Sequence, residues 1–400
     1  VNMLSTMPAG FERVELAGKL GSMRTPETHA HEVAAALGPR QVISRPLGQA
    51  QEMVLAADVH TAFPSPRFSN SQMDGYALPA TAAGSYEVGP TIAAGANPTE
   101  LLDGPLHTAC PIMTGAKVPE GTASIVPIEK CQPQEFLQPG ETITVPATEE
   151  GQFIRGTGTD LQQGVLLAAK GEKLTPVRLA ALASQGIEEV SVYRPARILV
   201  CTGGAEIGTG VAAIPDANAP LISAMAHRAG IEVAGYVTTD DDPEVLTRAL
   251  EEATQDYRPD AIVTSGGISA GKYEVIRQVL TGWFGHVDQQ PGGPQGIASF
   301  HGTPVICLPG NPISTMVSFR LFVAPTLGWA PAAYRVPIAH AIEGLPHKDQ
   351  FRRGYAGAQA RVTGGASSHL LAQAVDATHL IRIPAGKSLS AGEEVKVYPL

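Results

Sequence analysis

The sequence is poor in the residues that build metal cages, disulfide frameworks and aromatic cores. Its four cysteines form no Cys-x-x-Cys pair, and its eleven histidines form no His-Glu-x-x-His motif. We therefore expect neither a zinc module nor a disulfide framework. Cys201 and Cys307 each end an apolar run, where a buried structural thiol is expected. Aromatic residues make up only 5% of the chain, so the cores must rely on aliphatic side chains.

Positive charge is also scarce. The 28 Lys and Arg residues are outnumbered by 38 Asp and Glu residues, which gives a net charge of −10. A general nucleic-acid-binding protein usually presents a basic face, so this class is disfavoured. The charge does not argue against a small anionic ligand, because backbone N–H groups and helix N-termini can hold phosphate.

Long apolar runs are missing as well. No run approaches the ~18 residues that a membrane-spanning helix needs, and the chain opens on no segment of the signal-peptide type. We expect a cytoplasmic protein without membrane contact. The chain has 400 residues, and a single core rarely exceeds ~250–300 residues, so at least two domains are predicted.

Glycine and proline, by contrast, are abundant, with 43 and 33 residues. Short β-branched runs between these turn residues predict a β-rich inserted domain over residues 65–153. The flanking segments 41–64 and 154–195 are predicted to form a linking lobe. Helix-like runs lie within that lobe at Gln49–Val59 and Thr175–Gln185.

Strands and helices alternate between residues 196 and 336. This alternation predicts an αβα domain with a parallel-type sheet covered on both faces. Thr25, Pro26 and the later Gly38 mark an amphipathic helix, and residues 25–40 are expected to pack on that domain. Short β runs return over residues 337–400, which predicts a C-terminal β-barrel-like domain, while residues 1–24 are expected to form a tail. The fold class is thus a multi-domain combination of α/β and all-β parts.

Three strands of the αβα segment run into polar turns that contain glycine. These turns are Cys-Thr-Gly-Gly at 201–204, Thr-Ser-Gly-Gly-Ile-Ser-Ala-Gly at 264–271, and Leu-Pro-Gly-Asn-Pro at 308–312. Ligands bind outside the carboxyl ends of such strands, and glycine lets the backbone amides approach a phosphate. One turn alone is typical of an ordinary βα connection, but three together predict a phosphorylated ligand. None of them is a Walker A or a Gly-x-Gly-x-x-Gly motif.

Carboxylates follow these turns and suggest a magnesium site. Glu206 and Glu274 lie just after the first and second turns, and Asp240–Asp242 precede a predicted helix. Carboxylate oxygens suit Mg²⁺ bridged to phosphate. Two simpler interpretations stay open, since the acidic run can cap its helix and Glu206 can be a solvated surface residue.

Two further polar turns lie in the β-rich segment. They read NSQMDGYA at 70–77 and MTGAKVPEG at 113–121, and each alone would be taken as a structural loop. Together with the Arg155…Gly158…Asp160…Gly164 spacing, TSGGISAG and LPGNPIS, they occur in an order that resembles the molybdopterin molybdenumtransferases. This family includes bacterial MoeA and the E domain of gephyrin, and the resemblance covers roughly residues 25–400.

The resemblance implies four domains and an elongated homodimer. It implies cleavage of adenylylated molybdopterin, with Mg²⁺, as molybdate is inserted, releasing molybdenum cofactor and AMP. A contact with the adenylylating enzyme is a further expectation. Because the two groups of motifs fall in different domains, we expect the dimer to share its active site between subunits.

Single residues are carried over from the family's motifs as follows. The expected catalytic residues are Asp74, Thr114, Asp160, Glu206, Asp241 and Glu274, of which Glu206, Asp241 and Glu274 are the expected metal ligands. The expected pterin- and nucleotide-binding positions are Thr202, Gly203, Ser265, Gly266, Gly267, Ser269, Pro309, Gly310 and Asn311. Arg353 and Ser368 are similar to the family's oxyanion-contacting residues.

The chain also departs from the family's pattern. Gly204 stands where the family has Asp, Glu274 replaces an Asp, and Gln290 and Gly293 replace the two lysines of Lys-Pro-Gly-Lys-Pro. An alternative is therefore a catalytically weakened paralogue that binds molybdopterin or a partner enzyme. A third class, an unrelated sugar-phosphate or nucleotide enzyme, fits the ordered motifs least.

Overall fold

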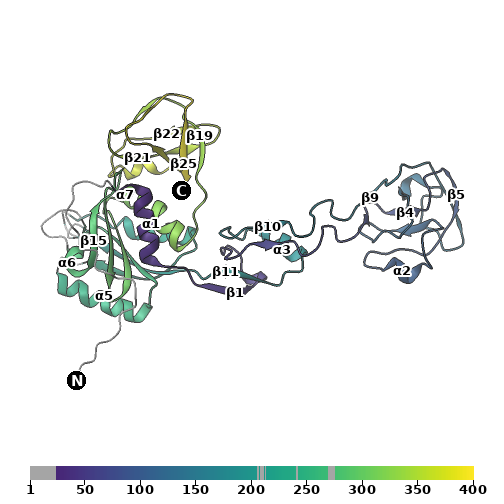
Figure 1. Ribbon diagram of the computed structural model, residues 1–400, viewed down its shortest axis with the longest axis horizontal. Helices are drawn as coiled ribbons and strands as arrows, with labels where there is room; N and C mark the ends of the chain where they lie inside the picture. The colour runs from purple at the N-terminus through teal and green to yellow at the C-terminus, as the bar shows by residue number, and fades with distance from the viewer. Residues whose placement is uncertain (1–23, 205–206, 208–210, 212, 240–241, 269–274) are drawn as a thin grey trace, which may run out of the picture. The chain divides into compact units, whose positions relative to one another are not determined.

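The computed structural model describes residues 24–204, 207, 211, 213–239, 242–268 and 275–400. The chain divides into two compact units, one of Val1–Gln41 with Arg194–Leu400 and one of Val42–Tyr193. Figure 1 labels their helices and strands. Within the described ranges, no helix has both the length and the apolar character needed to span a bilayer.

The first unit is built on a six-stranded mixed sheet with the order β13-β12-β14-β18-β17-β15. Four neighbouring strands are parallel, and all four were expected: β12 (Arg197–Gly203), β13 (Glu232–Thr239), β14 (Ala261–Ser265) and β18 (Thr303–Leu308). The α/β class is therefore confirmed, and the carboxyl ends of β12, β14 and β18 carry the three glycine turns.

Two antiparallel strands extend this sheet, and the sequence pattern did not predict them. They are β17 (Pro294–Phe300) and β15 (Thr281–His286). Glycine is depleted in strands, yet Gly282, Gly285 and Gly296 lie inside this hairpin. The reason is close packing: a Cβ at Gly282 would lie 2.3 Å from the carbonyl oxygen of Ile297.

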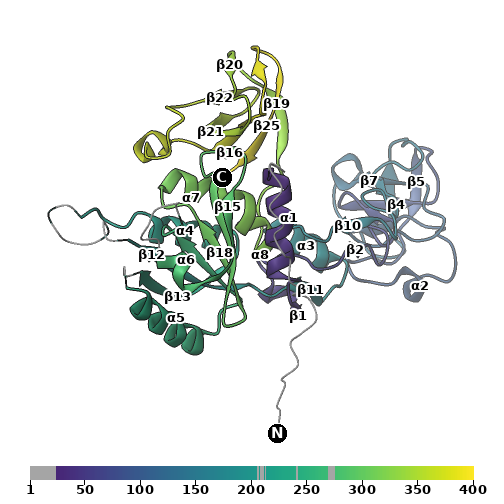
Figure 2. The same cartoon turned by 60° about the vertical axis from the view of Figure 1, so that its left-hand side comes forward.

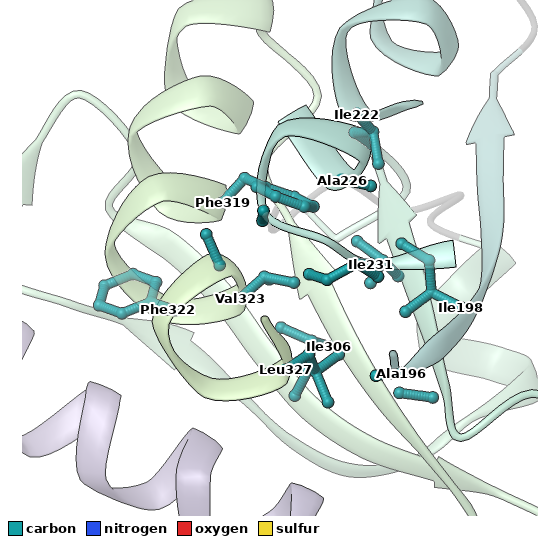
Figure 3. Close-up of a cluster of buried hydrophobic side chains, with 14 of the residues drawn as sticks. Ala196, Ile198, Ile222, Ala226, Ile231, Ile306, Phe319, Phe322, Val323 and Leu327 are labelled. Carbon is teal, nitrogen blue, oxygen red and sulfur yellow. The ribbon is translucent and has the colours of Figure 1, made fainter. Parts of the chain in front are cut away.

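Helices cover both faces of the sheet. One face carries α1 (Pro26–Leu37), α4 (Asn218–Arg228), a π-helix (Phe319–Val323) and α8 (Ala324–Leu327), whose buried side chains belong to the core that Figure 3 shows in part. Helix α7 (Pro312–Ser318) packs against α4 in a separate cluster. The other face carries α5 (Pro243–Tyr257) and α6 (Val275–Val279).

The cysteines are structural. All four are buried and free of disulfides, and Cys201 and Cys307 belong to the core under α5. Burial raises the pKa of both thiols to about 12. The expected role of these two residues as buried thiols is confirmed.

Helix α1 packs on the αβα sheet through a buried histidine. Thr25 caps the helix by accepting the N–H of Thr28, at 3.1 Å. His29 is fully buried, with its ring edge-on to Phe322 at a centroid distance of 4.6 Å. Burial, with a smaller contribution from the charge of Arg24, lowers the pKa of His29 to about 3, so the imidazole is neutral.

The C-terminal part of the first unit is a β domain (Figure 2). Its ladder runs β16-β21-β23-β25-β19, with β22 paired to β21 and β20 paired to β24. The strand β16 belongs to the αβα segment in sequence, so its parallel pairing with β21 joins the two parts. The bounds are β16 (Gln289–Gln290), β19 (Tyr334–Pro337), β20 (Ile342–Glu343), β21 (Asp349–Ala356), β22 (Ala360–Val362), β23 (His379–Ile383), β24 (Ser388–Leu389) and β25 (Glu394–Pro399), with a short 3-10 helix η4 (Leu371–Ala374).

The second unit contains short antiparallel ladders. They are β1 (Val42–Pro46) with β11 (Glu189–Tyr193), β2 (Val59–His60) with β10 (Leu166–Ala168), β3 (Asn70–Ser71) with β9 (Ile154–Arg155), β6 (Cys110–Ile112) and β7 (Ser124–Pro127) on either side of β4 (Gly75–Leu78), and β5 (Gly84–Glu87) with β8 (Thr142–Val145). Its helical elements are η1 (Leu47–Gln49), α2 (Pro98–Leu101), η2 (Ile128–Lys130) and α3 (Pro176–Ser184). The β-rich character of the inserted segment is confirmed, whereas the boundary between inserted domain and linking lobe stays a prediction.

The expected helix at Gln49–Val59 is wrong. That segment is mostly extended, because its backbone pairs with distant residues. The N–H of Leu55 donates to the carbonyl of Glu172 at 2.9 Å, and the N–H of Leu174 donates to Met53 at 2.8 Å. Tertiary pairing thus overrides the local helical periodicity.

Candidate functional site

The three glycine turns of the αβα sheet touch one another. A Cβ at Gly266 would lie 3.1 Å from the carbonyl oxygen of Gly203, and a Cβ at Gly310 would lie 3.3 Å from the Cα of Gly266. Gly203 and Gly266 also have positive φ angles of 140° and 97°. Larger residues would push the turns apart, which explains why glycine stands there.

The hydroxyl groups of this region are used to tie the turns together. Thr202 Oγ1 donates to Asp216 Oδ2 at 2.6 Å, and Ser265 Oγ donates to the carbonyl of Pro309 at 3.1 Å. A hydroxyl has only one proton to donate. Neither hydroxyl can therefore donate to an anion while these bonds last, so an anion at these turns would have to be bound by backbone N–H groups.

Asp216 is a site residue that sequence reasoning missed. Besides Thr202, its carboxylate accepts the backbone N–H groups of Asn218 at 2.8 Å and Ala219 at 3.1 Å, at the first turn of α4. The amide of Asn218 in turn donates to the carbonyl of Gly310 at 2.6 Å. Asp216 thus links the first glycine turn to α4 and, through Asn218, to the third. An aspartate two or three residues before a helical run was the available signal.

Replacing Asp216 by alanine is expected to loosen the start of α4. Loss of a capping carboxylate typically costs ~1 kcal/mol, so hydrogen exchange at the N–H groups of Asn218 and Ala219 should become about five- to ten-fold faster. Asp216→Asn keeps one oxygen acceptor for these amides and is the matched control, with little change expected. Equal exchange in the alanine variant and the native protein would show that the carboxylate does not hold the helix.

The turns line a cavity of about 970 Å³. Its other walls include residues 214–218 at the start of α4, His286 with 289–294, and two loops of the C-terminal β domain, at 345–348 and 366–369. Among the described lining residues, Lys348 is the one permanent cation and Asp216 the one carboxylate, joined by His286, His347 and His369. The cavity is large enough for a small phosphorylated ligand but weak in fixed positive charge.

The two positions that lack the family's lysines both line this cavity. Gln290 Oε1 accepts the side-chain amide of Gln350 at 2.7 Å. Gly293 does not have a positive φ, and the nearest neighbour of an added Cβ, His286 Cδ2, would be 3.4 Å away. A side chain is therefore sterically acceptable at position 293, although this chain has none.

Arg353 is held by a loop of the C-terminal β domain, and its expected oxyanion contact stays a prediction. It is 2% exposed and is not among the described residues that line the cavity. Its guanidinium donates to the carbonyls of Gly365 and Ser367, and burial, together with the charge of Arg352, lowers its pKa. Arg353 thus holds the loop that contains Ser368, and Ser368 itself lines the cavity.

The remaining expected residues of the second unit form two separate contacts. Asp74 Oδ1 accepts both the backbone N–H and the hydroxyl of Thr114, at 2.6 and 2.7 Å. These two hydrogen bonds lower the pKa of Asp74, so an exposed carboxylate is held charged and oriented. Asp160 Oδ2 accepts the hydroxyl of Ser65 at 3.1 Å.

Four expected residues lie outside the described part of the chain: Glu206, Asp241, Ser269 and Glu274. In the part that is described, no group of three His, Cys, Asp or Glu side chains is placed to hold a metal ion. The capping alternative for the acidic run holds for Asp242, whose carboxylate accepts the N–H groups of Glu244 and Val245 at the start of α5.

A mixed α/β sheet with a glycine-lined cavity, joined in one chain to all-β parts, defines a multi-domain ligand-binding protein. Three family models match it in succession: the MoeA N-terminal region (domain I and II) over residues 24–186, a probable molybdopterin binding domain over 197–329, and the MoeA C-terminal region (domain IV) over 335–400. The chain belongs to the MoeA family.

Relatives match over almost the whole chain. It is 33% identical to molybdopterin molybdenumtransferase 2 of Mycobacterium tuberculosis, over 94% of this chain and 100% of the relative. It is 31% identical to the molybdopterin molybdenumtransferase of Synechococcus elongatus, over 89% and 94%. The crystal structure of a molybdopterin biosynthesis MoeA protein from Pyrococcus horikosii superposes with a TM-score of 0.70 at 26% identity, over 94% and 99%.

Proposed function

We propose that the protein is a molybdopterin molybdenumtransferase. It would insert molybdenum from molybdate into adenylylated molybdopterin and release AMP, as a step of molybdenum cofactor biosynthesis, with the cytoplasm as its proposed location. The observation that carries the proposal is the contact of the three glycine turns at the wall of the 970 Å³ cavity. This cavity lies in the region that matches the molybdopterin binding model and the C-terminal MoeA model.

The turns supply what binding of a phosphorylated ligand requires. Their glycines let a ligand reach the backbone. The hydroxyls of Thr202 and Ser265 donate to protein oxygens and fix the turns, so they do not donate to the anion. Preorganised N–H donors stabilise charge that develops on phosphoryl oxygens. The role proposed for the αβα domain is thus to orient the pterin phosphate and the leaving nucleotide.

Asp74, Thr114 and Asp160 are proposed to act on the same ligand from the other subunit of a homodimer. Asp74 is held charged by Thr114, as expected of a group that orients a reactant through its negative charge. A contact between this dimer and the enzyme that adenylylates molybdopterin remains part of the proposal.

A divalent ion is proposed to neutralise phosphoryl charge when it is bound. The described lining residues do not form a site for it by themselves, since both oxygens of Asp216, the one carboxylate among them, accept hydrogen bonds. The proposed ligands are therefore Glu206, Asp241 and Glu274, whose assignment rests on the family resemblance.

Release of AMP from adenylylated molybdopterin should depend on both molybdate and Mg²⁺. Chelation should abolish release and added Mg²⁺ should restore it, because an uncompensated phosphoanhydride charge raises the barrier. Glu206→Gln should raise the Mg²⁺ concentration for half-maximal release by about ten-fold or more, the effect of losing one carboxylate ligand. Glu251→Gln, on the exposed face of α5, is the matched control.

Two results would contradict this proposal. AMP release that is indifferent to molybdate would remove the transferase assignment, and an unchanged Mg²⁺ requirement in Glu206→Gln would remove Glu206 from the metal site.

A second candidate, a paralogue that binds molybdopterin or a partner enzyme with little turnover, is favoured by the neutral residues at 290 and 293. It predicts ligand binding without AMP release.

A further inference from the structure

An arginine outside the cavity joins three elements of the first unit. Arg382, on β23, forms ion pairs with Glu27 on α1 and with Asp349 at the start of β21. The side chains of Arg382 and Asp349 are only 19% and 9% exposed, whereas that of Glu27 is 58% exposed. We call Glu27, Asp349 and Arg382 the Arg382 clamp. Its Arg382–Asp349 ion pair is buried, whereas its Arg382–Glu27 ion pair is half-exposed.

In the buried ion pair, the carboxylate of Asp349 has a second hydrogen-bond partner besides Arg382. Asp349 Oδ1 also accepts the backbone N–H of Ala385 at 2.8 Å. Burial acts to lower the pKa of Arg382, but the hydrogen bond to Glu27 and the charges of Asp349 and Glu27 together raise it above its ordinary value. Arg382 thus stays charged, and removing one partner of such a buried pair leaves the other uncompensated.

Asp349 connects the clamp directly to the cavity wall. Its N–H donates to the carbonyl of Asp288 at 3.0 Å, and it faces Gln289 in the parallel β16–β21 pairing. The next residue, Gln350, holds the side chain of Gln290. Gln289, Gln290 and Lys348 all line the cavity, so a shift of Asp349 moves the wall that carries the one permanent cation among the described lining residues.

We propose that Arg382 is a positioning residue for the ligand cavity. Together with Glu27 and Asp349 it fixes the start of β21 against α1, and so sets where Lys348 and Gln290 meet the ligand. Arg382 itself is not among the described lining residues. The identity of the ligand rests on the proposed function, but the mechanical role of the clamp does not.

The test compares Arg382→Met, Asp349→Asn and Glu27→Gln in the full-length protein. Each variant should speed hydrogen exchange in peptides that cover 288–290 and 347–351. Each should also raise the KM for molybdate about three- to ten-fold with little change in kcat, as expected of mutations that act at a distance from the ligand. Arg382→Lys should recover part of both effects.

The matched control is Glu232→Gln, which breaks the exposed ion pair with Arg197 at the amino ends of β12 and β13. It should leave exchange at 288–290 and 347–351 and the KM unchanged. If Asp349→Asn does not fold, Glu27→Gln still decides, because Glu27 is half-exposed. Unchanged exchange and KM in Glu27→Gln and Arg382→Met would overturn the proposal, and so would a fall in kcat at constant KM. If the native protein released no AMP, the proposed function would be wrong. The hydrogen-exchange rates at 288–290 and 347–351 would still test the positioning role of Arg382.

Discussion

Purified mixed dimers that combine an Asp74→Ala subunit with a Glu206→Gln subunit should recover about half of the native AMP release, although each variant alone is nearly inactive at limiting Mg²⁺. The expectation follows from a site shared between subunits. In a mixed dimer, one site receives both altered residues and the other receives neither. Each mixed dimer thus has one intact site of two, whereas an unfractionated mixture, in which random pairing makes about half of the dimers mixed, would recover only about a quarter.

The choice of Asp74 rests on its geometry. Both hydrogen bonds from Thr114 reach the same carboxylate oxygen, Oδ1, which leaves Oδ2 to face a reactant. Asp74→Asn is the matched control, because its amide oxygen can still accept from Thr114 while the charge is lost. If that variant is as inactive as the alanine variant, the charge of Asp74 is required and not its tie to Thr114.

The measurement is AMP release by dimers that carry two different affinity tags and are purified through both. Recovery in doubly tagged dimers, with none in either parent variant, supports a shared site. Absence of recovery would place both residues in one subunit's site. A monomeric species with full activity would also rule out sharing.

The sequence predicted the α/β part well because its strands have a strong local pattern. The runs at β12, β14 and β18 are mostly buried and mostly apolar, which is typical of parallel strands. The hairpin β15–β17 was missed because its glycines are required by contacts with neighbouring strands. Gln49–Val59 was misjudged for the related reason that distant backbone partners decide its conformation.

The site was predictable where a motif is also a structural necessity. The glycines of the three turns stand out in sequence, and their contacts explain them. The capping role of Asp216 had a local signal, but its bond to Thr202, 14 residues away, had none, and neither had the bond of Arg382 to Glu27, 355 residues away. The placement of Arg353 behind the cavity wall likewise depends on tertiary structure, because a motif fixes residue identity but not the direction of a side chain.

Restoring lysines at positions 290 and 293 should strengthen molybdate binding. At an effective dielectric near 20, a cation ~4 Å from an anion is worth about 4 kcal/mol before desolvation and screening. After those losses ~1–2 kcal/mol per contact should remain, which is roughly ten-fold in affinity. Gly293→Lys should approach this value, because position 293 has no positive φ and an added Cβ meets nothing closer than 3.4 Å.

Gln290→Lys should gain less than Gly293→Lys. The present glutamine accepts the amide of Gln350, which is itself buried, and a lysine cannot accept that hydrogen bond. Leaving this donor unpaired costs about 1 kcal/mol or more, which offsets much of the new attraction. A double change Gln290→Lys with Gly293→Lys should therefore bind molybdate only slightly more tightly than Gly293→Lys alone.

Calorimetric titration with molybdate at two ionic strengths tests whether the gain in affinity is electrostatic. The Debye length is ~30 Å at 0.01 M salt and ~8 Å at 0.15 M, so the gain of the lysine variants should shrink as salt rises. Thr281→Lys adds the same charge at the exposed far end of β15 and serves as the control, with little gain expected at the higher salt. If Gly293→Lys binds no more tightly than the native protein even at low salt, position 293 does not face the anion. The neutral residues at 290 and 293 would then give no reason to regard this chain as a weakened paralogue, because the cavity would bind molybdate by contacts in which those positions take no part.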